Sequence, residues 1–340
     1  MKMINTIVYA GRIKDKETLL NSSSGGAFTA ISDYFLNNGD AVVCAVYDYE
    51  KDETSYRLVT SKEVRDSARG SKYMQSKPYD IFSEAVNWLR TNPNKNLLFV
   101  GMGCQAEGFR KYTEQMSLRD RVYLVDIICH GSPSPLIWKQ YSKMIQHYSK
   151  GRIQYVTFKD KRKGWLSPTP LVIVNEKEHF IYDYVTIFYN RCALRPSCHV
   201  CPFATTERAT DITIGDFWHI EKTIPDFFDS DGTSVFLVHT EKGMELFQSI
   251  AKDLDFRESN VKDCWQRNLE YPTPVSEKRD EFWSDYQAGG IEFVMKKYAS
   301  RTVISRIKNK IIRVFFGGAT EGNISEPSYA DTILYEGRAA

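Results

Sequence analysis

Two apolar segments that each run into a cysteine constrain the fold most strongly. Residues 96–101 and 121–128 are continuous apolar runs, which favours strands buried on both faces of a parallel sheet. A predicted helix follows each of them, at about 105–116 and 134–148, and this order indicates a right-handed βαβ unit. Cys104 and Cys129 therefore come just past the carboxyl ends of parallel strands. In open α/β sheets, ligands bind at that edge.

The segment from Cys192 to Cys201 supplies further thiols. Cys198 and Cys201 form a Cys-x-x-Cys pair, whose thiolates can point from one tight turn at a single metal or cluster. Because two ligands do not close a tetrahedral site, we expect Cys104 and Cys129 to complete it. We also expect the amino end of the following helix to lower the pKa of Cys104. Whether Cys192 replaces one of these four ligands stays open.

Taken one at a time, the cysteines have a simpler interpretation as small buried residues. We interpret Cys44, in the apolar strand 41–47, and Cys264, in an expected helical stretch, in this way. An odd number of seven cysteines without a secretion signal suits thiols, clusters or metals better than a disulfide framework. The shared placement of the other four favours a common site.

Two polar, glycine-containing stretches are candidates for cofactor binding. Ser24, Gly25 and Gly26 precede a predicted helix that begins at Ala27, so free backbone amides could bind an anion there. An ordinary helix start explains the same pattern. The loop 68–76 has no clear periodicity, and it could hold a phosphate or be a plain solvated loop. Its candidate residues are Gly70, Ser71, Lys72 and Tyr73.

The pattern of elements predicts an α/β (α+β) fold in three regions. Residues 1–150 form an N-terminal α/β region with parallel strands, and 151–285 form a mixed or antiparallel β region that contains the Cys-x-x-Cys pair. A cysteine-ligated cluster would join these two regions. Residues 286–340 are expected to form a basic helix, over about 288–316, and a loose tail.

Composition narrows the class of function. The formal net charge of +2 argues against a dedicated nucleic-acid binder, which would carry a basic excess. No apolar run approaches the roughly 20 residues of a transmembrane helix, and no signal peptide is recognised. We therefore expect a soluble, cytoplasmic protein without a transmembrane segment.

Several motifs, in the same order, are similar to those of one family and extend over about residues 7–220. The chain resembles the beta subunits of coenzyme F420 (deazaflavin) hydrogenases and dehydrogenases, and in particular bacterial members found among polysaccharide biosynthesis genes. The matching stretches are Ser24-Gly25-Gly26-Ala27-Phe28, Gly70-Ser71-Lys72-Tyr73, Gly103-Cys104-Gln105, Cys129-His130-Gly131-Ser132-Pro133, Lys161-x-x-Gly164-Trp165, Arg195-Pro196-Ser197-Cys198-x-x-Cys201 and Asp211-Ile212-Thr213-Ile214-Gly215-Asp216.

The resemblance implies an iron-sulfur flavoprotein with one flavin, FAD or FMN, beside a 4Fe-4S cluster. It implies that Cys104, Cys129, Cys198 and Cys201 bind the cluster. Flavin-facing positions are implied at Ser24 to Gly26, at the Gly70 to Tyr73 loop, and at Gly215. Many relatives carry a ferredoxin-like segment ahead of the Ser-Gly-Gly stretch; here that stretch is close to the start. We therefore expect a separate electron carrier, such as ferredoxin, a reduced deazaflavin or a nicotinamide.

The leading hypothesis is a flavin-dependent iron-sulfur oxidoreductase acting on a small-molecule substrate, with a glycan precursor of polysaccharide biosynthesis as the expected class. His130, Lys72, Tyr73 and Asp216 are candidate catalytic proton donors. The alternative is a non-redox binding or sugar-modifying protein with a structural zinc site at the same cysteines. A scaffold subunit without activity is a third hypothesis, and assembly into a homo-oligomer stays open.

Overall fold

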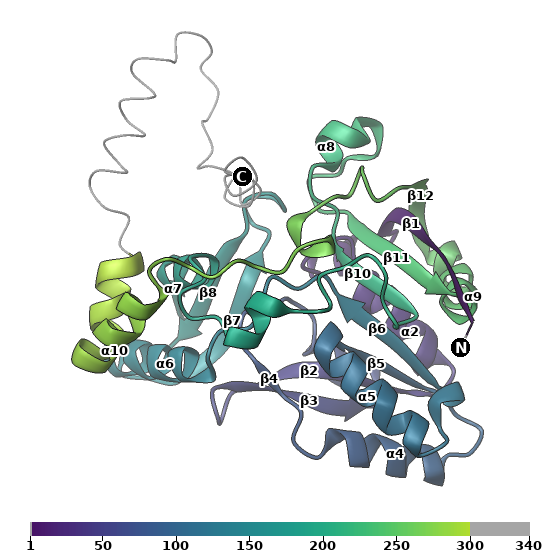
Figure 1. The fold of residues 1–340 in the computed structure, drawn as a ribbon, viewed down its shortest axis with the longest axis horizontal. Coiled ribbons are helices and arrows are strands. Elements are labelled where there is room, and N and C mark those ends of the chain that lie inside the picture. The colour runs from purple at the N-terminus through teal and green to yellow at the C-terminus, as the bar shows by residue number, and fades with distance from the viewer. Residues whose placement is uncertain (1, 300–340) are drawn as a thin grey trace.

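A large mixed sheet forms the centre of the molecule (Figure 1). The computed structural model describes residues 2–299. The strands of the large sheet are β1 (Met3–Ile13), β2 (Ala41–Asp48), β3 (Glu53–Val59), β4 (Ser76–Lys77), β5 (Leu97–Met102), β6 (Val122–Ile127), β10 (Ile212–Asp216), β11 (Ser234–Thr240) and β12 (Leu254–Ser259). Within the described residues they lie in the order β12-β1-β11-β10-β6-β5-β2-β3-β4.

The middle of the large sheet is parallel, as the continuous apolar runs predict. β2 pairs with β5, β5 with β6, and β6 with β10, all in parallel. In the pairing of β5 with β6, Met102 lies opposite Ile127. The carboxyl ends of these two strands therefore meet at one edge of the sheet, and the predicted α/β fold is confirmed.

Helices cover both faces of this sheet. The described helices are α1 (Lys16–Leu20), α2 (Ala27–Asn37), α3 (Lys62–Asp66), α4 (Ile81–Thr91), α5 (Gly103–Gln115), α6 (Pro135–Ser149), α7 (Tyr182–Tyr189), α8 (Ile220–Thr223), α9 (Glu241–Ile250) and α10 (Arg279–Val294). α2 and α9 pack on one face, and α4 and α5 on the other.

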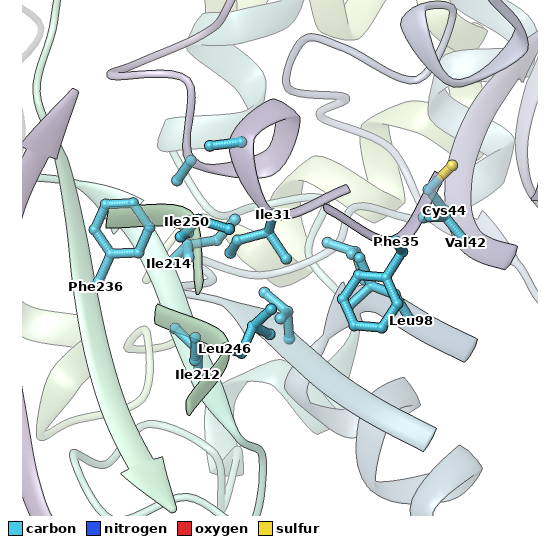
Figure 2. Packing of buried hydrophobic residues seen from close by; sticks show 14 of the residues in the cluster. Ile31, Phe35, Val42, Cys44, Leu98, Ile212, Ile214, Phe236, Leu246 and Ile250 are labelled. Atoms are coloured by element: carbon cyan, nitrogen blue, oxygen red, sulfur yellow. The ribbon is translucent and has the colours of Figure 1, made fainter. Parts of the chain in front are cut away.

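The period-two alternation of β2 explains why both faces are apolar. Val42 and Cys44 point into the core under α2 and α9, where they pack near Ile31 and Phe35 (Figure 2). Ala41 and its alternate neighbours on β2 face α4 and α5 instead. The interpretation of Cys44 as a buried core residue is confirmed, because its exposed fraction is 2%.

A second, antiparallel sheet lies beside the large one. It consists of β7 (Ile153–Asp160), β8 (Thr169–Val174) and β9 (Lys177–Phe180). α6, α7 and α10 gather around this sheet (Figure 1), and residues of these helices share one apolar cluster with β7 and β8. Trp138 of α6, with 2% of its surface exposed, is among its largest members.

The three predicted regions stay a prediction, although β10 to β12, which follow residue 150, belong to the same large sheet as β1 to β6. β9 ends at Phe180, and the chain turns into α7 from Tyr182. Cys264 is buried in a turn rather than in the expected helix. α10 and a π-helical turn extend to residue 299, whereas the rest of the predicted basic helix and the predicted tail lie outside the described residues. Among residues 2–299, none of the helices is long and apolar enough to cross a bilayer.

Candidate functional site

Four cysteines come together at the carboxyl edge of β5 and β6. Cys104 is in the first turn of α5, and Cys129 follows β6 by two residues. Cys198 and Cys201 come from a short 3-10 turn, Pro196–Val200, and the residue after it. Burial, together with the charges of Cys198, Cys104 and Cys201, raises the pKa of Cys129 to about 12. The four thiols thus interact electrostatically, as the sequence predicts for a shared site.

The start of α5 lowers the pKa of Cys104 as expected, but the net shift of this pKa is upward. Burial and the charges of Cys201 and Cys198 raise the pKa of Cys104. The amides of Cys104 and Gln105 at the start of α5 oppose this effect only in part. Burial and the neighbouring thiols together therefore outweigh the helix end. A bound cation or cluster would reverse this balance, because it binds thiolates and stabilises them.

The segment that carries Cys198, residues 193–198, is held against the loop that follows β6. Ser132 donates its backbone N–H to Cys198 Sγ at 3.3 Å, and the N–H of Arg195 donates to the carbonyl of Ser132 at 2.9 Å. A Cβ on Gly131 would lie 2.9 Å from the Leu194 side chain and 3.5 Å from Cys198 Cβ. Only glycine allows this close approach, and Gly131 also has a φ of +142°.

Cys192 lies apart from this group. Its exposed fraction is 1%, and it belongs to the apolar cluster around the small sheet. Its Sγ is 3.3 Å from Ser276 Oγ and 3.5 Å from the carbonyl oxygen of Asn190. These contacts support a structural role for Cys192, so the four predicted ligands remain the better set.

The chemistry of the four thiols bears on the kind of metal group that they can hold. In residues 2–299, no three His, Cys, Asp or Glu side chains are placed to hold a single metal ion. The predicted donor set is all sulfur, which suits an iron-sulfur cluster and a structural zinc ion alike.

A cavity of about 320 Å³ opens beside Cys129. Most of the sequence-predicted cofactor and catalytic residues line it. They are Ser24, Gly26, Gly70, Ser71, Lys72, Tyr73, His130, Gly215 and Asp216. Gly25 does not line the cavity; a Cβ there would meet the Gly11 carbonyl oxygen at 2.4 Å and the Ser234 nitrogen at 2.5 Å. Gly25 is therefore required for packing between the helix entry and the sheet.

The two predicted polar stretches are bound to each other. Ser23 Oγ accepts hydrogen bonds from Ser71 N at 2.7 Å and from Ser71 Oγ at 3.1 Å. Ser24 Oγ donates to the Thr233 carbonyl at 2.8 Å, and Lys161 Nζ donates to the Ser24 carbonyl at 2.7 Å. These bonds fix the wall of the cavity. Lys161, in the charged connection 158–165, thereby supports that wall.

His130 presents an unpartnered nitrogen in the cavity lining. Its Nε2 is buried and has no hydrogen-bond partner among the described residues. Burial, with a smaller contribution from the charge of Arg191, lowers the pKa of His130 to about 4. The imidazole is therefore neutral at pH 7. A buried polar atom without a partner is a feature that a ligand can satisfy.

Lys72 and Tyr73 are oriented by their own surroundings. Lys72 Nζ donates to the carbonyls of Ala68, Arg69 and Gly70 at 2.8–3.1 Å, and burial lowers its pKa to about 8. The Tyr73 ring stacks on Phe188 with a centroid distance of 4.6 Å. Both residues line the cavity, but Lys72 directs its hydrogen bonds to its own loop.

Asp216 is held as a carboxylate anchor. Both of its side-chain oxygens are 2.7 Å from Lys159 Nζ, and Trp165 Nε1 donates to Oδ1 at 2.7 Å. Lys159 also lies over the Trp218 ring, which stacks on Trp165 at 5.3 Å. Both oxygens of Asp216 are therefore occupied by donors, and these contacts support a positioning role at the end of β10.

The sequence did not point to several of the residues around the site. Arg267, Gln266 and Asn268 line the cavity from a loop far along the chain, and no motif marks them. A second cavity, of about 660 Å³, adjoins the first. The two share lining residues from both polar stretches. The shared residues are Ser22, Ser23, Arg69, Gly70, Ser71 and Lys72.

Comparisons with known proteins agree with the motif pattern. Residues 8–80 match the family model for the N-terminal part of the coenzyme F420 hydrogenase/dehydrogenase beta subunit, and residues 94–263 match the model for the C terminus of the same beta subunit. Among curated proteins, no match was found. Among solved structures, the chain is similar to one from the F420-reducing [NiFe] hydrogenase complex of Methanosarcina barkeri. The identity is 18% and the TM-score 0.51, over 87% of this chain and 91% of that chain. At this identity the likeness shows the fold.

Proposed function

The chain belongs to the coenzyme F420 hydrogenase/dehydrogenase beta-subunit family, and on this premise we propose that it is an iron-sulfur flavoprotein oxidoreductase. In this proposal Cys104, Cys129, Cys198 and Cys201 hold a 4Fe-4S cluster, and the adjoining cavity holds the ring of a flavin. When bound, the two groups supply single-electron transfer and two-electron hydride chemistry. The protein supplies their placement and surroundings.

One observation carries the proposal: Cys129 belongs both to the thiol group and to the lining of the 320 Å³ cavity. A flat ring in that cavity would lie directly beside the cysteine-bound group. His130, the next residue, also lines the cavity, so one short loop after β6 serves both binding sites. A zinc ion with a purely structural role would not need a ligand-binding cavity beside its cysteines.

The cavity also suits a flavin chemically. Gly70 has a φ of +88°, and a Cβ there would meet no atom within 4 Å. The backbone at Gly70 therefore leaves space for a ligand to approach closely. The α2 helix begins at Ala27, its N-cap Gly26 provides no side-chain cap, and its first residues line the cavity. Arg69 donates from Nε to Thr29 Oγ1 of α2 at 3.2 Å. Free amides at a helix start and a nearby guanidinium would both favour a flavin phosphate.

The residues divide into different tasks in this proposal. Neutral His130, with its unpartnered Nε2, is the best-placed group to hydrogen-bond the ring or the substrate and to pass on a proton. Lys72, with a pKa of about 8, is the second candidate for that role. Tyr73 would border the ring through its aromatic face, and Asp216 would position Lys159 and Trp165.

The adjoining 660 Å³ cavity gives room for the remainder of a dinucleotide or for the substrate. Its lining includes five cationic residues and two carboxylates, which favours an anionic ligand. We propose a small-molecule substrate of the glycan-precursor class. Electrons would come from a separate carrier such as ferredoxin, a reduced deazaflavin or a nicotinamide. A reducing cytoplasm is the compartment that this chemistry requires.

Purification of the full chain without oxygen tests the proposal. We expect brown protein that contains iron, acid-labile sulfide and flavin, and whose visible absorbance bleaches with dithionite. Incubating the apoprotein with FAD or FMN identifies the flavin, and mixing with each reduced carrier identifies the donor. A colourless product that holds only zinc would overturn the proposal and support the structural alternative.

A further inference from the structure

A buried ion pair lies behind the four cysteines. Arg208 Nη1 donates to Asp126 Oδ2 at 2.7 Å, and the two side chains are 3% and 1% exposed. Asp126 is on β6, three residues before Cys129, whereas Arg208 follows Cys201 by seven residues. A single buried charge without its partner is costly, so the two residues depend on each other.

The pair lies against the segments that carry Cys104, Cys129 and Cys201. Arg208 Nη1 also donates to the Ile127 carbonyl at 3.1 Å, and its Nε donates to the Thr205 carbonyl at 2.9 Å. Asp126 Oδ2 lies only 2.9 Å from where a Cβ on Gly103 would be, beside Cys104. One ion pair therefore links the end of β6, the start of α5 and the chain after Cys201.

The other oxygen of Asp126 is bound as well. Thr210 Oγ1 donates to Asp126 Oδ1 at 3.0 Å, and Thr213 Oγ1 donates to it at 2.5 Å. These contacts of the carboxylate all come from residues 208–213, which lead from the cysteine turn into β10. The orientation of this segment is fixed by a fully satisfied buried network.

We propose that Arg208 and Asp126 are positioning residues for the iron-sulfur cluster: they hold the Cys201 segment onto the ends of β5 and β6, and their opposite charges together set the reduction potential of the cluster. This inference rests on the proposed function, because it presupposes a cluster at the four cysteines. Neighbouring groups that orient the ligands of a metal are a general determinant of its affinity and potential.

The two charges have opposite effects on an electron added nearby. Removing the guanidinium leaves a negative charge close to the cluster, which disfavours reduction. Removing the carboxylate leaves a positive charge, which favours reduction. Arg208→Gln should therefore shift the midpoint potential to more negative values, and Asp126→Asn to more positive values. A role limited to folding would not produce shifts of opposite sign.

The full chain, purified and reconstituted without oxygen, allows a direct test. The variants are Arg208→Gln, Arg208→Lys, Asp126→Asn and the double variant Arg208→Gln/Asp126→Asn. Arg65→Gln is the matched control. Arg65 is also buried, with 1% of its side chain exposed, and it forms an ion pair with Asp33 at a distance of 2.6 Å. This pair lies away from the four predicted ligand cysteines. The readouts are iron per chain, the rate of iron loss to a chelator, and the midpoint potential in a redox titration.

We expect Arg208→Gln to lose iron to the chelator about tenfold faster than the unmodified chain. Arg208→Lys should recover part of that loss, and the double variant should return toward the original potential. Arg65→Gln should match the unmodified chain in all three readouts. Unchanged iron retention and potential in folded Arg208→Gln and Asp126→Asn would overturn the proposal, as would shifts of the same sign. If Arg208→Gln does not fold, Asp126→Asn and Arg208→Lys still test the sign and the rescue. Failure of the unmodified chain to take up iron would instead refute the proposed function.

Discussion

Gly25 and Gly70 both belong to the polar stretches predicted to face a flavin, yet the structure gives them different requirements. At Gly25 a Cβ would lie 2.4 Å from the Gly11 carbonyl oxygen and 2.5 Å from the Ser234 nitrogen. Both contacts are backbone atoms of neighbouring strands, β1 and β11, so no side chain can rotate away. Relieving them requires the α2 entry to move away from the sheet.

We therefore expect Gly25→Ala to lower the free energy of unfolding by about 3 kcal/mol, at the upper end of the usual cost of overpacking. Gly70→Ala should cost only about 1 kcal/mol, because its φ of +88° is unfavourable for alanine but no atom lies within 4 Å of the added carbon. Denaturant unfolding followed by tryptophan fluorescence measures both variants against the unmodified chain.

Flavin binding provides the second measurement for the same pair. Gly70→Ala places a methyl group at the cavity lining, so it should weaken flavin binding more than it lowers stability. Gly25→Ala should show the reverse pattern under conditions in which it remains folded. Equal unfolding costs for the two variants, or a larger cost for Gly70→Ala, would refute the packing argument for Gly25.

Three further predictions concern single side chains. Cys198→Ser should abolish most cluster binding, whereas Cys192→Ser should keep it because the Cys192 thiol contacts Ser276 within the core. Iron and sulfide analysis distinguishes the two variants, and retention of full iron in Cys198→Ser would contradict the predicted set of ligands. Lys159→Met should lower the unfolding free energy by about 3 kcal/mol, because Asp216 loses the cation that holds both oxygens; an unchanged denaturation midpoint would contradict this. Burial lowers the pKa of His239 from 6.5 to about 4. Between those pH values the His239 imidazole binds a proton only in the unfolded chain, so the free energy of unfolding should fall by about 3 kcal/mol as the pH drops from 6.5 to 4. His239→Gln should reduce that dependence in unfolding curves measured from pH 7 to 4.5, and an identical slope would contradict it.

Sequence periodicity was sufficient for the elements whose burial is regular. β5 and β6 are buried along nearly their whole length and lead into Cys104 and Cys129, so both the parallel sheet and the cysteine positions could be predicted. β12 could not, because most of its residues are exposed and show no alternation. α7 was missed because its aromatic residues pack against the small sheet on several sides, which obscures the helical period.

The sequence identified the members of the site better than their tasks. Lys161 and Lys159 stand in a basic run that resembles a solvated turn, yet Lys159 is 5% exposed and pairs with a carboxylate 57 residues away. The direction of the Cys104 pKa shift depends on its burial and on the approach of the other thiols, and spacing along the chain determines neither. The sequence shows the type and charge of each residue directly. The effect of that charge depends on a partner that can lie far away along the chain, and only the fold brings the two together.

The connection between the cysteine turn and β10 shows why these tasks depend on the completed fold. Ile212 lies opposite Val125 in the parallel pairing of β10 with β6, and β10 pairs with β11 on its other side, so β10 lies between these two strands. That pairing brings the segment after Cys201 over the strand ends and allows Arg208 to reach Asp126. The same strand ends in Gly215 and Asp216, which line the cavity. This one strand therefore contributes to both the thiol group and the cavity wall, which would couple assembly of the proposed cluster site to assembly of the proposed flavin site.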